Sequence, residues 1–179
     1  MSLPLWANPL LQGLSFWIGY KKQLYPHYPL SEGAIVGESQ NLLYSRLEKG
    51  QKLFCEYPYS KIIDLPETDN RADLVILEND LPSVVIEVKR YEAGIKLIYS
   101  DFEKLSSIKV DNNKIRCFVL LISQQKIPTH FVRKDGIANR GIYIYNSIEF
   151  SVIRNCKASS SLKEGAAQNA NYATLIEIL

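Results

Sequence analysis

The chain has 179 residues, of which 46% are hydrophobic and 22% are charged, and its net charge is +2. This balance is typical of one globular domain and excludes a polycation that binds nucleic acid through overall charge alone. The three cysteines are far apart and odd in number, which indicates reduced thiols in a cytoplasmic protein and not a disulfide or zinc framework. They are Cys55, Cys117 and Cys156.

The N-terminal segment is apolar but is interrupted by proline and glycine. It lacks basic leading residues and a clear small-residue cleavage site, so it is a poor signal peptide. It is also too short and broken to predict a membrane span. Asn8 as the N-cap and Pro9 at the first helical position predict a helix that runs to about Tyr20. We expect this helix to pack against the core, and docking onto a second subunit is the alternative.

A second helix is predicted over Ala34–Lys49, after a loop rich in proline, because apolar residues recur there at helical spacing. Glu38 lies one turn before Leu42, at the edge of the apolar stripe. Its carboxylate therefore faces either the protein interior or water. A strand is predicted next, over Lys52–Ser60.

The two following segments, Arg71–Leu77 and Ser83–Tyr91, are rich in Val, Ile and Leu and predict two strands. The residues between them have turn character, which predicts a hairpin. If the chain folds back about Asp80, antiparallel pairing places Asp73 directly opposite Glu87.

Side chains in a strand alternate between its two faces, so Asp73, Glu87 and Lys89 are expected to share one face. Directly opposed side chains lie about 5 Å apart at Cβ, so two carboxylates placed in this way repel each other. A divalent cation between them removes the repulsion. The alternative is a solvated strand end in which Arg71 balances Asp73.

Another helix is predicted after the hairpin, beginning either near Ile95 or at Ser100, which forms an S-x-x-E capping box with Glu103. The segment Ile115–Ser123 is apolar on both faces and predicts a central strand covered on both sides. Because a helix separates it from the second strand of the hairpin, the two strands should be parallel.

Residues Gln124–Arg140 predict a polar loop, and Gly141–Ile153 predicts one or two further strands. Residues 157–179 are expected to form a C-terminal tail or a short helix. The whole chain is thus predicted to be a single α/β domain, with a core at about residues 34–153 and helices packed on a mixed sheet.

This order of elements, together with Asp73 and the Glu87-Val88-Lys89 string, resembles the PD-(D/E)xK nuclease superfamily, which has the restriction-endonuclease-like fold. The resemblance covers roughly Ala34–Ser123, and it implies an αβββαβ core to which an N-terminal helix is added. One departure is that Ala72, and not proline, precedes the aspartate.

The resemblance implies a Mg²⁺-dependent endonuclease, in which Mn²⁺ can substitute for Mg²⁺. It assigns Asp73, Glu87 and Lys89 to catalysis, and it assigns Asp73, Glu87, the Val88 carbonyl and Glu38 to metal binding. Lys89 would orient or deprotonate the attacking water, or stabilise the charged phosphate. Glu38 would hold a second metal or a bound water.

The resemblance implies nucleic acid as the partner, and DNA is expected. No association with a membrane is expected, and a homodimer is left open. Between Glu56 and Glu103 there are eleven acids against five bases, and between Lys104 and Arg140 there are eight bases against two acids. An acidic site beside a basic surface suits a metal centre that handles a polyanion, although scattered solvated lysines give the same counts. The alternative function is a nuclease-like fold that serves as a binding or assembly module without catalysis.

The remaining polar and aromatic residues near these motifs are predicted to have structural roles. Asp101 and Lys104 are predicted to be surface or capping residues of the helix after the hairpin. Tyr57 and Tyr59 alternate along the preceding strand and are predicted to pack against the core.

Overall fold

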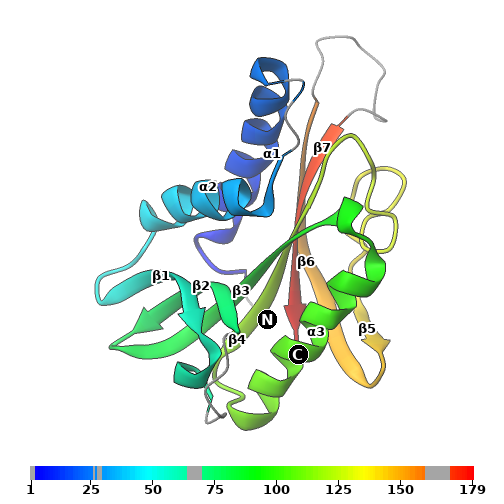
Figure 1. Ribbon diagram of the computed structural model, residues 1–179. Helices are drawn as coiled ribbons and strands as arrows, with labels where there is room; N and C mark the ends of the chain where they lie inside the picture. Colours follow the sequence, from blue (N-terminus) through cyan, green and yellow to red (C-terminus); the bar gives the residue numbers. More distant parts are fainter. Residues whose placement is uncertain (1–2, 26, 28–29, 64–69, 160–169) are drawn as a thin grey trace.

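The computed structural model describes residues 3–25, 27, 30–63, 70–159 and 170–179. These residues form an α/β fold in which helices flank a seven-stranded mixed sheet (Figure 1). The strand order is β1-β2-β3-β4-β7-β6-β5, and every neighbouring pair is antiparallel except β3 and β4. The elements in chain order are α1 (Ala7–Leu24), α2 (Glu32–Tyr44), β1 (Gln51–Pro58), η1 (Tyr59–Lys61), β2 (Arg71–Glu78), β3 (Leu81–Arg90), η2 (Tyr91–Ala93), α3 (Ile95–Asp111), β4 (Arg116–Ser123), β5 (Ile142–Tyr145), β6 (Ile148–Ser159) and β7 (Ala170–Ile178).

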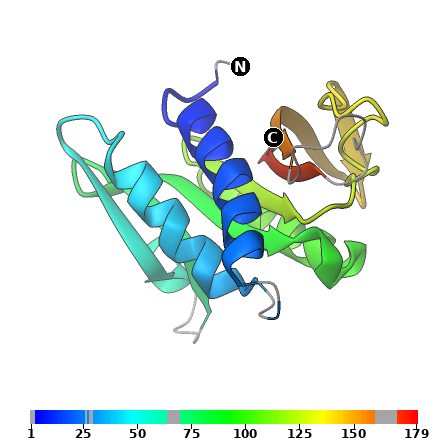
Figure 2. The same cartoon turned by 90° about the horizontal axis from the view of Figure 1, so that it is seen from above.

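Helices cover both faces of the sheet. Helices α1 and α2 lie side by side and pack on one face through residues such as Leu14 and Ile35 (Figure 2). Helix α3 packs on the other face through Phe102 and Leu105. Strand β4 contributes buried apolar side chains to both cores, which confirms the prediction of a central strand that is parallel to its predecessor.

The β2–β3 hairpin has the predicted register next to the candidate site, where Leu74 pairs with Ile86 and Val75 with Val85. The strands run further toward the turn than expected. A bulge after Ile76 shifts the last pairs by one residue, and the turn itself is Asn79-Asp80, both with positive φ. Asparagine and aspartate tolerate this left-handed conformation, which the tight turns of hairpins require.

The helix boundaries differ from the predicted ones. Helix α1 begins at Ala7, so Asn8 and Pro9 lie in its first turn, where a proline without an N–H breaks no helical hydrogen bond. Helix α2 begins at Glu32 because the Ser31 side chain accepts a hydrogen bond from the Ala34 N–H. Helix α3 begins at Ile95, which confirms the first of its two predicted starts and excludes the capping box at Ser100 as the start.

The prediction of a tail or short helix over residues 157–179 is also wrong. Residues up to Ser159 continue β6, and Ala170–Ile178 forms β7. Strand β7 pairs with β4 on one side and with β6 on the other, so it lies inside the sheet and all of its residues are buried. The sheet core therefore extends well beyond residue 153, and residues 160–169 lie outside the described part.

Two further predictions can be compared with the structure. The three cysteines are free thiols, as expected, and Cys117 is fully buried. Within the described residues, no helix is both long enough and apolar enough to span a membrane.

Candidate active site

Asp73 and Glu87 lie side by side on the face of the sheet that α3 covers. Asp73 lies two residues before Val75 on β2, and Glu87 lies two residues after Val85 on β3. Side chains two residues apart on a strand share a face, and Val75 and Val85 belong to the core under α3. Asp73 immediately precedes the part of β2 that pairs with β3, and its Oδ2 accepts a hydrogen bond of 2.6 Å from the Val88 N–H of β3. The Asp73 and Glu87 carboxyl groups lie close enough for each to shift the pKa of the other. The structure thus brings the two predicted acids together.

The position of Val88 orients its carbonyl toward the same site. In an extended strand the N–H and C=O of one residue point to the same neighbouring strand. Because the Val88 N–H points to Asp73 of β2, its carbonyl oxygen also points to the β2 side. The Val88 side chain is fully buried in the opposite core, under α1 and α2.

Burial raises the pKa of both carboxyl groups. The pKa of Glu87, which is only 4% exposed, rises to about 8 because of burial and then because of the neighbouring Asp73 charge. The Asp73 pKa is also raised by burial, against the opposing effects of the Val88 N–H and of Glu87. Glu87 therefore keeps its proton near neutral pH.

Tyr59 is a second neighbour of Glu87. Its hydroxyl donates a hydrogen bond to Glu87 Oε1, and its ring is 5% exposed. Burial and the Glu87 charge raise the pKa of Tyr59, so the hydroxyl keeps its proton. Tyr59 packs in the core, as predicted, but it does not lie on a strand, because β1 ends at Pro58 and Tyr59 begins η1.

Lys89 extends the cluster toward two helices. Its Nζ lies 3.3 Å from Asp101 Oδ2 of α3 and 3.4 Å from Glu32 Oε2 of α2. Burial lowers the pKa of Lys89, but the charges of Asp101 and Glu32 outweigh burial and leave the pKa above its ordinary value. Lys89 is therefore a fixed ammonium ion beside the carboxyl pair.

Asp101 is the unexpected member of the cluster. It is 2% exposed, so the prediction of a surface or capping residue is wrong for Asp101. Its second oxygen, Oδ1, lies 2.9 Å from the Nζ of Lys104, one turn further along α3. The signal was present in the sequence, because Asp101 is three residues after Ile98 and four before Leu105, within the buried stripe of α3.

Glu38 stands apart from this cluster. It lies six residues after Glu32 on α2, which corresponds to a rise of about 9 Å and a different helix face. Among the contacts of the described residues, none joins Glu38 to Asp73, Glu87 or Lys89. Glu32, in the first turn of α2, is the helical acid that the structure brings to Lys89.

The cluster offers few side chains to a metal ion. The described residues contain no group of three or more His, Cys, Asp or Glu side chains that could hold one. Mg²⁺ needs fewer, because it is often bound by one or two carboxylates and keeps several waters. Asp73 and Glu87, with the Val88 carbonyl, fit this smaller donor set.

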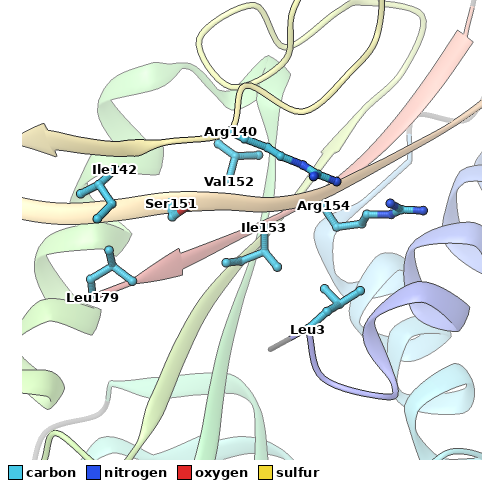
Figure 3. A pocket seen from close by; sticks show the side chains of 8 residues that line it. All are labelled: Leu3, Arg140, Ile142, Ser151, Val152, Ile153, Arg154 and Leu179. Carbon is cyan, nitrogen blue, oxygen red and sulfur yellow. The ribbon is translucent and has the colours of Figure 1, made fainter. Parts of the chain in front are cut away.

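A separate pocket of about 400 Å³ lies on the far half of the sheet. It contains two arginines that extend in the same direction and no acidic side chain (Figure 3). None of the clustered residues lines it. Its lining residues are Leu3, Arg140, Ile142, Ser151, Val152, Ile153, Arg154 and Leu179.

Comparisons with known proteins assign no family to the chain. No protein-family model matches the sequence, and neither a curated protein nor a solved structure matches it. The geometry of the carboxylate and lysine cluster is therefore the basis for a functional assignment.

Proposed function

We propose that this protein is a metal-dependent nuclease that hydrolyses phosphodiester bonds in nucleic acid, with DNA as the expected substrate. The observation that carries the proposal is the close approach of two carboxyl groups on adjacent strands, the half-buried Asp73 and the buried Glu87. Two such groups on adjacent strands destabilise the sheet when both are ionised. A divalent cation bound between the two groups would remove this repulsion, so the pair favours a metal site.

The order of elements supports the same proposal. The segment from α2 to β4 runs helix, three strands, helix, strand, and β3 is parallel to β4. This is the αβββαβ order that the resemblance to restriction-endonuclease-like proteins implies. We therefore assign the chain to that fold, extended by α1 before the core and by β5, β6 and β7 after it.

The residues present fit a Mg²⁺ ion. Asp73 and Glu87 would supply carboxylate oxygens, and the Val88 carbonyl would supply a third oxygen from the same edge of β3. When bound, Mg²⁺ supplies an activated water at neutral pH and neutralises charge on the phosphate. Tyr59 would keep Glu87 oriented through its hydrogen bond.

Lys89 would stabilise the phosphate as a cation. The sequence left open whether Lys89 deprotonates the attacking water or stabilises the phosphate. Its contacts with Asp101 and Glu32 favour the charged form, and a fixed ammonium ion is suited to the negative charge that develops on the phosphate oxygens.

A second candidate function is a binding or assembly module without catalysis. The hydrogen bond from Tyr59 to Glu87 and the raised pKa of Glu87 favour this candidate, because a protonated Glu87 does not repel Asp73 in the absence of a metal. The two candidates differ in their predicted chemistry and not in their fold.

The experiment is incubation of plasmid and single-stranded DNA with the protein in Mg²⁺, Mn²⁺ or EDTA. We expect cleavage that needs the metal and falls about 100-fold or more in Asp73→Asn and in Lys89→Met. Lys96→Gln, an exposed change on α3, is the control and should cleave normally. DNA binding without cleavage under every condition would favour the module, and cleavage that survives Asp73→Asn would exclude this site.

A further inference from the structure

A buried carboxylate on α3 joins two lysines next to the carboxyl pair. Asp101 Oδ2 lies 3.3 Å from Lys89 Nζ, and Asp101 Oδ1 lies 2.9 Å from Lys104 Nζ. Both lysines act electrostatically on the pair, since the Lys89 charge affects Asp73 and the Lys104 charge affects Glu87. The two ammonium groups therefore lie around the proposed metal site.

Burial of the Asp101 carboxylate costs the folded state free energy, which indicates that the residue has a role other than stability. A charged group at 2% exposure loses its hydration, and paired cations repay this loss only in part. The neighbours of Asp101 on the buried stripe of α3 are Ile98, Phe102 and Leu105, so an apolar residue would suit the helix packing better. A carboxylate at this position instead fixes where the two ammonium groups lie.

We propose that Asp101 positions Lys89 and Lys104 as a two-point phosphate-binding site, in which Lys104 contacts a non-bridging oxygen of the substrate phosphate. This inference rests on the proposed nuclease function and adds Lys104 and Asp101 to its machinery. Lys104 touches the substrate, whereas Asp101 is a positioning residue that acts through the lysines.

The contacts and exposure of the two lysines indicate different roles for them. An ammonium group has three donors. Lys89 donates a hydrogen bond to Glu32 and forms an ion pair with Asp101, and its side chain is 17% exposed. Lys104 is held by Asp101 and its side chain is 47% exposed, so it presents the remaining donors to the solvent side, where a phosphate arrives.

The first test measures binding of a short fluorescein-labelled DNA duplex in Ca²⁺ by anisotropy, with the DNA checked to be intact. Lys104→Gln should weaken binding about 5- to 20-fold and reduce the slope of log K against log salt by about 1. Lys96→Gln removes the same charge from the exposed start of α3 and should leave the affinity within about twofold. Equal affinities and salt slopes for the two variants would overturn the role of Lys104.

The second test separates positioning from folding and from metal binding. Asp101→Asn should lower kcat about 10- to 100-fold while leaving Mn²⁺ affinity, measured by electron paramagnetic resonance, within about twofold. Glu103→Gln makes the same acid-to-amide change on the exposed face of α3 and is the control. If Asp101→Asn fails to fold, Lys104→Gln still tests the site.

Failure of this inference differs from failure of the proposed function. A wild-type protein that cleaves DNA while Asp101→Asn and Lys104→Gln keep wild-type kcat and KM would overturn the two-lysine site alone. A wild-type protein that cleaves no nucleic acid with any metal would overturn the nuclease proposal. In that case the anisotropy comparison still decides whether Lys104 binds phosphate.

Discussion

Glu87→Gln should make the metal-free protein more stable while abolishing cleavage. Glu87 has a pKa of about 8 in the folded protein against an ordinary value of 4.5, because it is buried beside Asp73. At about 1.4 kcal/mol for each pH unit, the raised pKa lowers the free energy of unfolding by roughly 5 kcal/mol above pH 8 and by roughly 3 kcal/mol at pH 7. Glutamine is neutral, and its side-chain oxygen can still accept the hydrogen bond from Tyr59.

The sign of the effect follows from where the proton binds. Well below pH 4.5 the carboxyl group is neutral in both states, so the wild type and the variant should differ little. Between pH 4.5 and 8 the unfolded chain releases its proton while the folded protein retains it, so the wild type loses stability relative to the variant. Above pH 8 the difference should be constant.

The assay is urea denaturation in EDTA at several pH values, compared with Glu103→Gln as an exposed control on α3. A gain of about 3 kcal/mol is a large part of the 5–15 kcal/mol typical of a domain, so it is measurable. Equal stability of the wild type and Glu87→Gln from pH 5 to pH 9 would refute the reasoning. Gain of stability with loss of activity is typical of a residue kept for function.

Three further predictions concern the same cluster and its supporting core. Mn²⁺ affinity should rise by up to about tenfold per pH unit and level off above pH 8, because the metal must displace the proton of Glu87; calorimetric titration would show this, and a flat profile would contradict it. Tyr59→Phe removes a hydrogen bond that lowers the Glu87 pKa, so the pH profile of cleavage should move to higher pH, whereas an unmoved profile would exclude this contact in solution. Phe102→Ala should lower the free energy of unfolding by about 3–5 kcal/mol, whereas the exposed Val110→Ala should change it little when both are measured by urea denaturation.

The hairpin could be predicted from the sequence because its geometry is local. Two strands joined by a short turn have a register that the turn fixes, so the partners of Val75 and Leu74 follow from residue numbers alone. Asp73 and Glu87 then fall on one face through the alternation of the strand. The bulge near the turn did not affect this result, because it lies on the far side of the correctly paired residues.

Contacts between distant segments could not be predicted in the same way. Tyr59 reaches Glu87 only because β1 ends at Pro58 and the chain turns over the sheet, which no local pattern specifies. Strand β7 inserts between β4 and β6, although its sequence follows a polar segment that suggested a tail. The position of this strand in the sheet depends on the partners available on both sides, which no local pattern specifies.

Along most of β2 and β3 the residue types suit both a strand conformation and the packing of the two cores. The exceptions lie together at one cluster. Apolar residues fill both cores at every paired position from Leu74 to Ile76 and from Val84 to Ile86. At Asp73, Glu87 and Lys89 the same strands instead carry three ionisable groups, and α3 adds a buried carboxylate opposite them. Sequences that break local rules at one cluster, while obeying them along the rest of the same two strands, usually do so for function. A stability-only explanation would require that replacing this cluster with neutral side chains of the same shape destabilises the protein, and the raised pKa of Glu87 predicts the opposite.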